Sequence, residues 1–534
     1  MFQPVTELRP ITLLNCDYRI LSKLLVKRMK PVLPDVIKSG QLCTVEGRNI
    51  LFGVNNILST ILYVNQKRSQ ACVISLDFYK AYDRVLLSFL LKVMKKMGFS
   101  EMFCKWIVML HSGVKTKFLL KKLSKTINVQ FSIRQGDPIA MLLYVIYVEP
   151  LLRYLERKIT GLRMLSIRSG PECLTQKLES YCDDINVPTN NLDDFFAVDE
   201  GVRKFESVSG AILSRNKKCQ IIGLGLWKSR NSWPLAYLQP VTELEVFGII
   251  LTNSFRQLMK KNWDLRTSKF EKCVASWSSR HFKSLTQRVE ILKVFALSRV
   301  FYVASIIPMT KTVVNQIEKI VGKFLWRSTG KILRIPLEEI KNPVEKGGLG
   351  LLCISAMSKS LLISQLLRLL KSGYGRSLHV GYWIGEILNE FHDSFNDMTH
   401  SHNALGLYSV LAEIMTDLKL SEVISVSNWR KLTNKNIYNS YTEEFPVPKV
   451  ERDAGVTLSH IWKKLLSPSL QSESKEVLYL SIHNKLPVRE RLFRIGIVND
   501  PYCEECLEET GAVISDVLHV FCQCMKVQDI WKLI

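Results

Sequence analysis

The sequence predicts a globular α+β protein, and three observations support this prediction. Residues 71–76 (ACVISL) are continuously apolar and rich in β-branched side chains, as expected of a buried strand. Apolar residues recur at helical spacing over 17–29 and 192–208, and 141–152 reads as a buried helix. With 534 residues and 47% hydrophobic content, the chain is long enough for several domains with cores of their own.

The charge of the chain favours a polyanionic partner. Its 73 basic and 49 acidic residues give a formal net charge of +24, which favours nucleic acid as the partner, with an anionic membrane as the weaker alternative. No membrane span is predicted, because the longest apolar run, 139–148, has ten residues and ends at Glu149 and Pro150. Most of the 13 cysteines are scattered singly, which is typical of a reducing compartment, so we expect an intracellular protein of the cytoplasm and nucleus.

Two adjacent carboxylates, Asp183 and Asp184, stand in the segment YCDD between two short apolar stretches. A pair of acids is most often a solvated turn. Neighbouring carboxylates raise each other's pKa unless a cation lies beside them, so a metal site is the alternative. Asp77 follows the buried strand and is the third candidate, since three carboxylates can hold two ions for in-line phosphoryl transfer.

Three segments in order resemble the motifs of reverse transcriptases. SLDFYKAYDRV (75–85) resembles motif A, RQGDP (134–138) resembles motif B, and YCDD (181–184) resembles the Tyr-x-Asp-Asp box. Residues 9–37 resemble the start of the fingers in non-LTR (LINE-type) retrotransposon enzymes, with the Tx-one-like elements as the predicted subgroup. QLCTVEGR (41–48) corresponds to that family's QTGFVPGR-like loop, from which it departs at three positions. The resemblance implies a right-hand polymerase with fingers, an antiparallel palm sheet and a helical thumb.

The resemblance also assigns candidate roles. Asp77, Asp183 and Asp184 would hold two Mg²⁺ ions. Tyr82 is either a core aromatic or the residue that excludes ribonucleotides, and Lys217 matches the motif D lysine, with Lys218 as an equally placed alternative. The further candidates are Arg9, Phe78, Gln135 and Gly136 for the nucleotide, and Tyr181, Phe247, Gly248, Lys283 and Arg288 for primer and template.

The last 54 residues predict a zinc site. Cys503, Cys506, His519 and Cys524 form a usual ligand set for a tetrahedral zinc ion, with Cys522 as a rival for the fourth position. The family resemblance favours Cys524, because four residues separate it from the histidine. Asp500 and Asp516 are interpreted as solvated residues.

Four regions follow from this interpretation: truncated fingers and palm (1–255), a helical thumb (256–345), a helical connector (346–480) and the zinc module (481–534). The predicted activity is RNA-directed DNA synthesis, which uses an RNA template, a DNA primer or target, and deoxynucleoside triphosphates. The endonuclease usual in this family is expected to be missing from the chain. The alternative is an inactive transposon remnant that only binds nucleic acid.

Overall fold

The computed structural model divides the chain into two compact units, which are described separately. Unit 1 contains Met1–Asn262 and Leu362–Leu432, and unit 2 contains Trp263–Leu361 and Thr433–Ile534. Two helices, α8 (Phe255–Ser278) and α13 (Ile354–Lys371), run across the boundaries between the units. The structure describes residues 11–119, 122–128, 133–164, 174–216, 218–280, 284–326, 335–371, 383, 406–415, 431–442, 445–465, 470–507 and 511–533.

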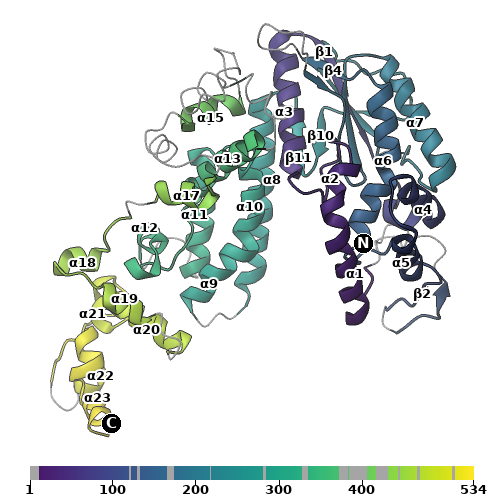
Figure 1. Ribbon diagram of the computed structural model, residues 1–534. Helices are drawn as coiled ribbons and strands as arrows, with labels where there is room; N and C mark the ends of the chain where they lie inside the picture. The colour runs from purple at the N-terminus through teal and green to yellow at the C-terminus, as the bar shows by residue number, and fades with distance from the viewer. Residues whose placement is uncertain are drawn as a thin grey trace. The chain divides into compact units, whose positions relative to one another are not determined.

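A five-stranded sheet forms the centre of unit 1 (Figure 1), in the order β6-β7-β1-β8-β9. Strand β1 is central and pairs antiparallel with β7 and with β8, and β6 pairs antiparallel with β7. The buried strand predicted at 71–76 is therefore confirmed. The strands are β1 Gln70–Leu76, β6 Glu179–Tyr181, β7 Asp184–Thr189, β8 Gln220–Gly225 and β9 Gln239–Pro240.

Helices cover both faces of this sheet, since β1 buries side chains on each side. Cys72, Ile74 and Leu76 alternate into a core shared with α6 and α7, and Ala71 and Val73 point to the opposite face, where α3 contacts β8 (Figure 1). The helices of unit 1 are α1 Cys16–Met29, η2 Lys30–Val32, α2 Leu33–Val36, α3 Ile50–Lys67, η3 Ala81–Arg84, α4 Leu87–Lys96, α5 Glu101–His111, α6 Ala140–Lys158, α7 Asp193–Ser209 and α15 Leu407–Met415.

Three two-stranded hairpins complete the described part of unit 1. One of them, β10–β11, has Phe247 and Gly248 in its turn, and both residues have positive φ (51° and 80°). The hairpin strands are β2 Lys115–Thr116 with β3 Ile127–Asn128, β4 Leu162–Met164 with β5 Leu174–Gln176, and β10 Glu243–Val246 with β11 Ile249–Thr252.

The described residues of unit 2 are mainly helical. Its elements are α9 Leu285–Ile291, η4 Leu292–Leu297, α10 Ser298–Ala304, α11 Lys311–Trp326, α12 Leu337–Lys341, η5 Val344–Lys346, α17 Asn434–Ser440, α18 Lys449–Ala454, α19 Ser459–Leu465, α20 Ser472–Ile482, α21 Arg489–Arg494, α22 Glu504–Leu507, η8 His519–Gln523 and α23 Met525–Leu533. The described helices include none long and apolar enough to cross a membrane.

Two sequence predictions about the palm need correction. The sheet is mixed rather than antiparallel, because β9 pairs parallel with β8 through Gln220–Gln239 and Ile221–Pro240. The helix predicted at 141–152 continues to Lys158 with Pro150 inside it, because buried residues flank the proline on both sides and their packing offsets the missing hydrogen bond. The alternating pattern of residues 129–133 (VQFSI) also predicts a strand, but of these residues the structure describes only Ile133.

Candidate active site

Asp77 lies at the end of the central strand, where a second segment of chain pairs with it. The carbonyl of Asp77 accepts a hydrogen bond from the Ser214 amide (2.8 Å), and the next residue, Phe78, forms an antiparallel bridge with Leu213. The Asp77 Oδ2 atom is buried and accepts no hydrogen bond from the described residues. The Nζ atom of Lys218 lies 3.9 Å from this oxygen. The pairing thus brings a carboxylate and a lysine together at one end of the sheet.

Asp183 lies with Cys182 in the turn between β6 and β7, as predicted, whereas Asp184 is the first residue of β7 and pairs with Tyr181. The register pairs Leu76 with Ile185, so one further step along both strands places Asp77 opposite Asp184. The environments of the two acids differ. Asp183 is half-buried and lines the pocket described below, whereas Asp184 is exposed and does not line it. The structure therefore brings Asp77 and the Asp183–Asp184 turn to the same end of the sheet.

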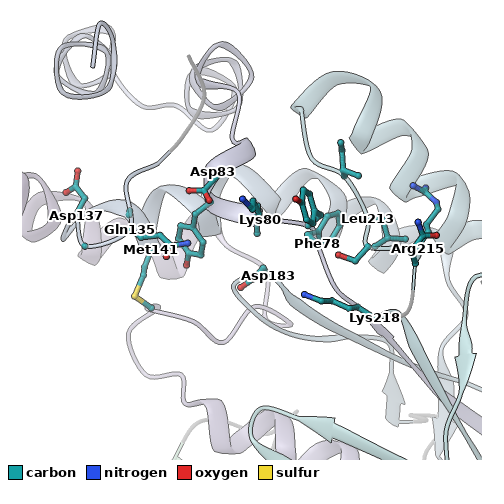
Figure 2. A pocket seen from close by; sticks show the side chains of 18 of the residues that line it. Phe78, Lys80, Asp83, Gln135, Asp137, Met141, Asp183, Leu213, Arg215 and Lys218 are labelled. Atoms are coloured by element: carbon teal, nitrogen blue, oxygen red, sulfur yellow. The ribbon is translucent and has the colours of Figure 1, made fainter. Parts of the chain in front are cut away.

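A pocket of about 1230 Å³ lies at this end of the sheet. Figure 2 shows Asp183 at the tip of its turn, with the Lys218 side chain extended toward the same side of the pocket. The residues that line it come from four parts of the chain separated in sequence: 78–83, 135–138 with 140–141, Asp183, and 212–216 with Lys218. Four of the predicted nucleotide-binding residues, Phe78, Tyr82, Gln135 and Gly136, are among them.

The loop with Gln135 and Gly136 is held by the buried carboxylate of Asp137. This carboxylate accepts hydrogen bonds from the Tyr18 hydroxyl (2.6 Å) and the Ser22 hydroxyl (2.5 Å), both on α1. The guanidinium of Arg134 lies 3.8 Å from Asp137 Oδ2, donates to the Tyr18 hydroxyl and stands 4.4 Å from the Tyr18 ring centroid. Sequence reasoning missed Tyr18 and Ser22, although their spacing of four places both on one face of the helix.

A buried histidine stands on the other side of the same carboxylate. His111 Nε2 lies 3.8 Å from Asp137 Oδ2, and both side chains are almost completely buried. Burial lowers the pKa of His111 to about 4, since it outweighs the opposing effect of the Asp137 charge. The imidazole is therefore neutral at pH 7, and the charge of Asp137 is balanced mainly by Arg134.

Tyr82 lines the pocket from the short helix η3 and does not belong wholly to the core. Its ring stacks on Tyr144 of α6, with centroids 4.7 Å apart and an interplanar angle of 25°. Burial raises the pKa of the Tyr82 hydroxyl, with a smaller contribution from Cys182, so the side chain stays neutral. The backbone carbonyl of Tyr82 accepts a hydrogen bond from the Ile133 amide (2.9 Å), which holds this part of η3 close to the segment that leads into the 135–137 loop.

The predicted primer contacts lie beside the acidic turn. Tyr181, immediately before the turn, and Phe247, in the β10–β11 hairpin, have ring centroids 6.1 Å apart in an edge-to-face arrangement. Gly248 follows in the same hairpin turn. Three predicted residues, Arg9, Lys217 and Lys283, lie outside the described residues.

Arg288 belongs to unit 2, where its guanidinium donates to the Leu325 carbonyl at the end of α11. This contact gives Arg288 a structural role, and its contact with nucleic acid stays a prediction.

The predicted zinc ligands converge in unit 2. Cys503, Cys506, His519 and Cys524 are buried, and one ligand atom from each lies within 4.8 Å of all the others. Among the described residues, no other group of three or more Cys, His, Asp or Glu side chains brings its ligand atoms this close together. Cys522 is exposed, so the structure favours Cys524 as the fourth ligand.

Asp500 and Asp516, interpreted as solvated, instead support this module. Asp500 makes a two-pronged ion pair with the Arg489 guanidinium (3.0 and 2.9 Å), and Asp516 accepts a hydrogen bond from the His519 amide (2.6 Å). The pair of Arg489 and Asp500 spans eleven positions and leaves no local pattern, whereas Asp516 caps the helix that follows it, a contact that its spacing of three from His519 could have indicated.

Comparison with known proteins identifies the fold around the pocket. Residues 3–251 match the reverse transcriptase (RNA-dependent DNA polymerase) family. They form a reverse transcriptase domain. All the residues that line the pocket lie within the matched range, so the pocket belongs to this domain, and the α+β fold around it fits a right-hand polymerase.

The relatives of this reverse transcriptase domain are proteins of non-LTR retrotransposons. The transposon TX1 uncharacterized 149 kDa protein of Xenopus laevis is 23% identical over 380 residues, which are 68% of this chain and 27% of that protein. The retrovirus-related Pol polyprotein from type-1 retrotransposable element R2 of Bradysia coprophila is 20% identical over 355 residues, 65% of this chain and 39% of that protein. The chain thus spans about a quarter to two fifths of the length of these relatives.

Among solved structures, a telomerase from Candida tropicalis in complex with a TWJ fragment of telomeric RNA is 11% identical. The match covers 79% of this chain and 56% of that chain, with a TM-score of 0.34.

Proposed function

We propose that this chain is an RNA-directed DNA polymerase of a non-LTR retrotransposon, which extends a DNA 3′-hydroxyl on an RNA template. The observation that carries the proposal is the pocket inside the matched domain. Its lining combines Asp183 of the acidic turn with Tyr82 and the 135–137 loop, and Asp77 stands at the end of the same sheet. The net charge of +24 suits the two nucleic acid partners.

The donor set suits a divalent cation such as Mg²⁺, which prefers carboxylate oxygens. Asp77 offers a buried Oδ2 atom that accepts no hydrogen bond from the described residues, and Asp183 lines the pocket at the same end of the sheet. Asp77, Asp183 and Asp184 would hold two such ions. When bound, the ions would lower the pKa of the primer 3′-hydroxyl and neutralise charge on the triphosphate.

The remaining residues of the pocket would position the nucleotide. Gly136 has a φ of 102°, and a Cβ there would lie 2.8 Å from the Thr12 carbonyl, so only glycine allows this close approach of the two backbones. The adjacent Gln135 carbonyl accepts a hydrogen bond from the Thr12 amide (2.9 Å). Of the two candidate lysines of motif D, Lys218 is the one that the structure describes; it lines the same pocket and would stabilise the leaving pyrophosphate.

We also propose that Cys503, Cys506, His519 and Cys524 hold one Zn²⁺ ion. A tetrahedral ion with Zn–S bonds of about 2.3 Å and a Zn–N bond of about 2.05 Å would separate two sulfurs by about 3.8 Å and a sulfur from the nitrogen by about 3.5 Å. The distances from Cys506 Sγ are 3.9 Å to Cys524 Sγ and 3.5 Å to His519 Nε2. These two distances, and the convergence of all four ligand atoms within 4.8 Å, support the proposed zinc site.

Zinc content tests the ligand set with two serine substitutions. Cys506→Ser should remove one equivalent of zinc, measured by plasma mass spectrometry on the purified protein. Cys522→Ser is the matched control, because this cysteine is exposed and outside the cluster. Equal zinc in both variants, or a loss confined to Cys522→Ser, would contradict the assignment.

Primer extension tests the polymerase. The full chain is given an RNA template annealed to a DNA primer, Mg²⁺ and four deoxynucleotides, and Asp183→Asn is compared with Asp193→Asn. Asp193 is an exposed acid in the first turn of α7 and lies outside the pocket. We expect extension by the wild type and by Asp193→Asn, and none by Asp183→Asn.

The same assay separates the proposed enzyme from an inactive remnant. A wild-type chain that binds the primer–template, measured by fluorescence anisotropy, but adds no nucleotide would support the remnant. Extension that survives in Asp183→Asn would place the reaction elsewhere. We also propose that the protein acts inside the cell and that a nick in its DNA target supplies the primer 3′-hydroxyl.

A further inference from the structure

The acidic turn contains a residue in an unfavourable backbone conformation. Cys182, between Tyr181 and Asp183, has a φ of 55°, in the left-handed region that glycine and asparagine adopt most readily. Its side chain is buried, with 3% exposure. Something outside the turn must therefore stabilise this conformation, because the residue itself does not favour it.

A single side chain, that of Gln41, binds both peptide groups of Cys182. The Gln41 Oε1 atom accepts hydrogen bonds from the amides of Cys182 (3.1 Å) and Cys43 (3.0 Å). The Gln41 Nε2 atom donates to the Ser180 hydroxyl (3.1 Å) and, at a longer distance, to the Cys182 carbonyl (3.5 Å). Gln41 is fully buried, so water does not compete for these bonds.

The backbone around Gln41 is anchored independently of its side chain. The Leu42 amide donates to the Ser180 carbonyl (2.8 Å), and the Ser180 amide donates to the Gly40 carbonyl (2.8 Å), so this segment extends the sheet beside β6. The Arg48 guanidinium donates to three carbonyls of the same loop, including that of Gln41 (2.7 Å). These backbone contacts hold the Gln41 side-chain amide in place beside the turn.

We propose that Gln41 is a positioning residue for the reaction: it holds Cys182 in the left-handed conformation and so directs Asp183 into the pocket. The inference rests on the proposed polymerase function. It predicts that loss of the Gln41 amide disturbs the placement of a metal-binding carboxylate, beyond any effect on stability. The residues at 40–43 do not themselves line the pocket, so Gln41 acts only through the turn.

The test compares Gln41→Met, which keeps the side-chain length without the amide, with Gln176→Met. Gln176 is the matched control: it is also a buried glutamine, and its amide donates to Glu179 Oε1 (2.7 Å) on β6 without touching the turn. We expect Gln41→Met to lower kcat about 10- to 100-fold, the equivalent of one or two hydrogen bonds, with the Kd for primer–template unchanged. Gln176→Met should keep the kcat of the wild type.

A second substitution distinguishes positioning from general stability. Glycine adopts a φ of 55° without penalty, so Cys182→Gly should make the turn less dependent on Gln41. The fall in kcat caused by Gln41→Met should therefore be smaller in the Cys182→Gly background than in the wild type. An equal fall in both backgrounds, or equal kcat for Gln41→Met and Gln176→Met, would overturn the proposal. Gln41→Asn, which keeps an amide one methylene shorter, serves if Gln41→Met does not fold.

Binding of Mn²⁺, measured by electron paramagnetic resonance, separates this inference from the proposed function. A wild type that adds no nucleotide refutes the polymerase. Weaker Mn²⁺ binding in Gln41→Met than in Gln176→Met would still support the positioning role. Equal Mn²⁺ affinity in the two variants, or no binding by the wild type, would refute it.

Discussion

Replacement of Asp137 by asparagine should loosen the contact between the 135–137 loop and α1. An asparagine keeps one acceptor oxygen for the Ser22 hydroxyl and the Ile139 amide (3.2 Å), but its nitrogen faces the Tyr18 hydroxyl in place of Oδ2. One charge-assisted hydrogen bond is lost, and the mostly buried Arg134 loses its counter-charge. We expect a cost of about 3 kcal/mol, between that of one such bond and that of a broken buried pair.

Native-state hydrogen exchange of the full chain measures this cost locally, which suits a protein of two units. The amides of α1 and of the 137–140 turn should exchange about 150-fold faster in Asp137→Asn, the equivalent of 3 kcal/mol. Amides of α20, in unit 2, should be unchanged. Asp17→Asn is the control, because Asp17 is exposed and adjacent to Tyr18. A change below about 1 kcal/mol in α1, or an equal change in the control, would refute the role given to this carboxylate.

Three further outcomes are expected. Tyr82→Val should open space beneath the sugar and reduce discrimination against ribonucleotides by about 10- to 100-fold, measured as the ratio of kcat/KM for a deoxynucleotide to that for the matching ribonucleotide. An unchanged ratio would mean that Tyr82 serves only as a core aromatic. Lys218→Gln should slow nucleotide addition more than Lys217→Gln if the lysine beside Asp77 assists the leaving group, and the reverse order would favour Lys217. As the pH falls from about 6.5 to 4, the unfolded chain binds a proton at His111 before the folded chain does. The free energy of unfolding of unit 1 should therefore fall by up to about 3 kcal/mol over this pH range, measured by hydrogen exchange of the α5 amides. In His111→Gln the same measurement should depend much less on pH.

Sequence patterns predicted those parts of the fold whose signals are local. The strand at 71–76 follows from its unbroken apolar run, and the turn at 183–184 follows from two acids between short strands. The four zinc ligands follow from their types and spacing. The two-residue strand β9, in contrast, has no apolar pattern of its own, so its parallel pairing with β8 was not predictable.

The residues that hold the site were harder to predict, because their partners are distant in sequence. Gln41 reaches Cys182 across 141 positions, and Tyr18 reaches Asp137 across 119. Neither pairing leaves a periodic pattern in either segment, and a polar residue in an apolar stretch gives no indication of its partner. Adjacent residues of the same type also gave no indication of which one, Asp183 or Asp184, lines the pocket, because this depends on backbone conformation.

The division of the chain between its two units delays the moment at which unit 1 can complete its fold during synthesis. Unit 1 contains Leu362–Leu432, so about 170 residues are synthesised after Asn262 before its last segment leaves the ribosome. At 5–20 residues per second this takes roughly 10 to 30 seconds. Until then α3 lacks the contact that Ser59 makes with the Tyr408 hydroxyl (2.5 Å), and Trp383, which stacks on Tyr408, is not yet in place. The nascent unit 1 therefore passes through a stage in which the buried Ser59 hydroxyl lacks its partner and the stacked pair of Trp383 and Tyr408 has not yet formed.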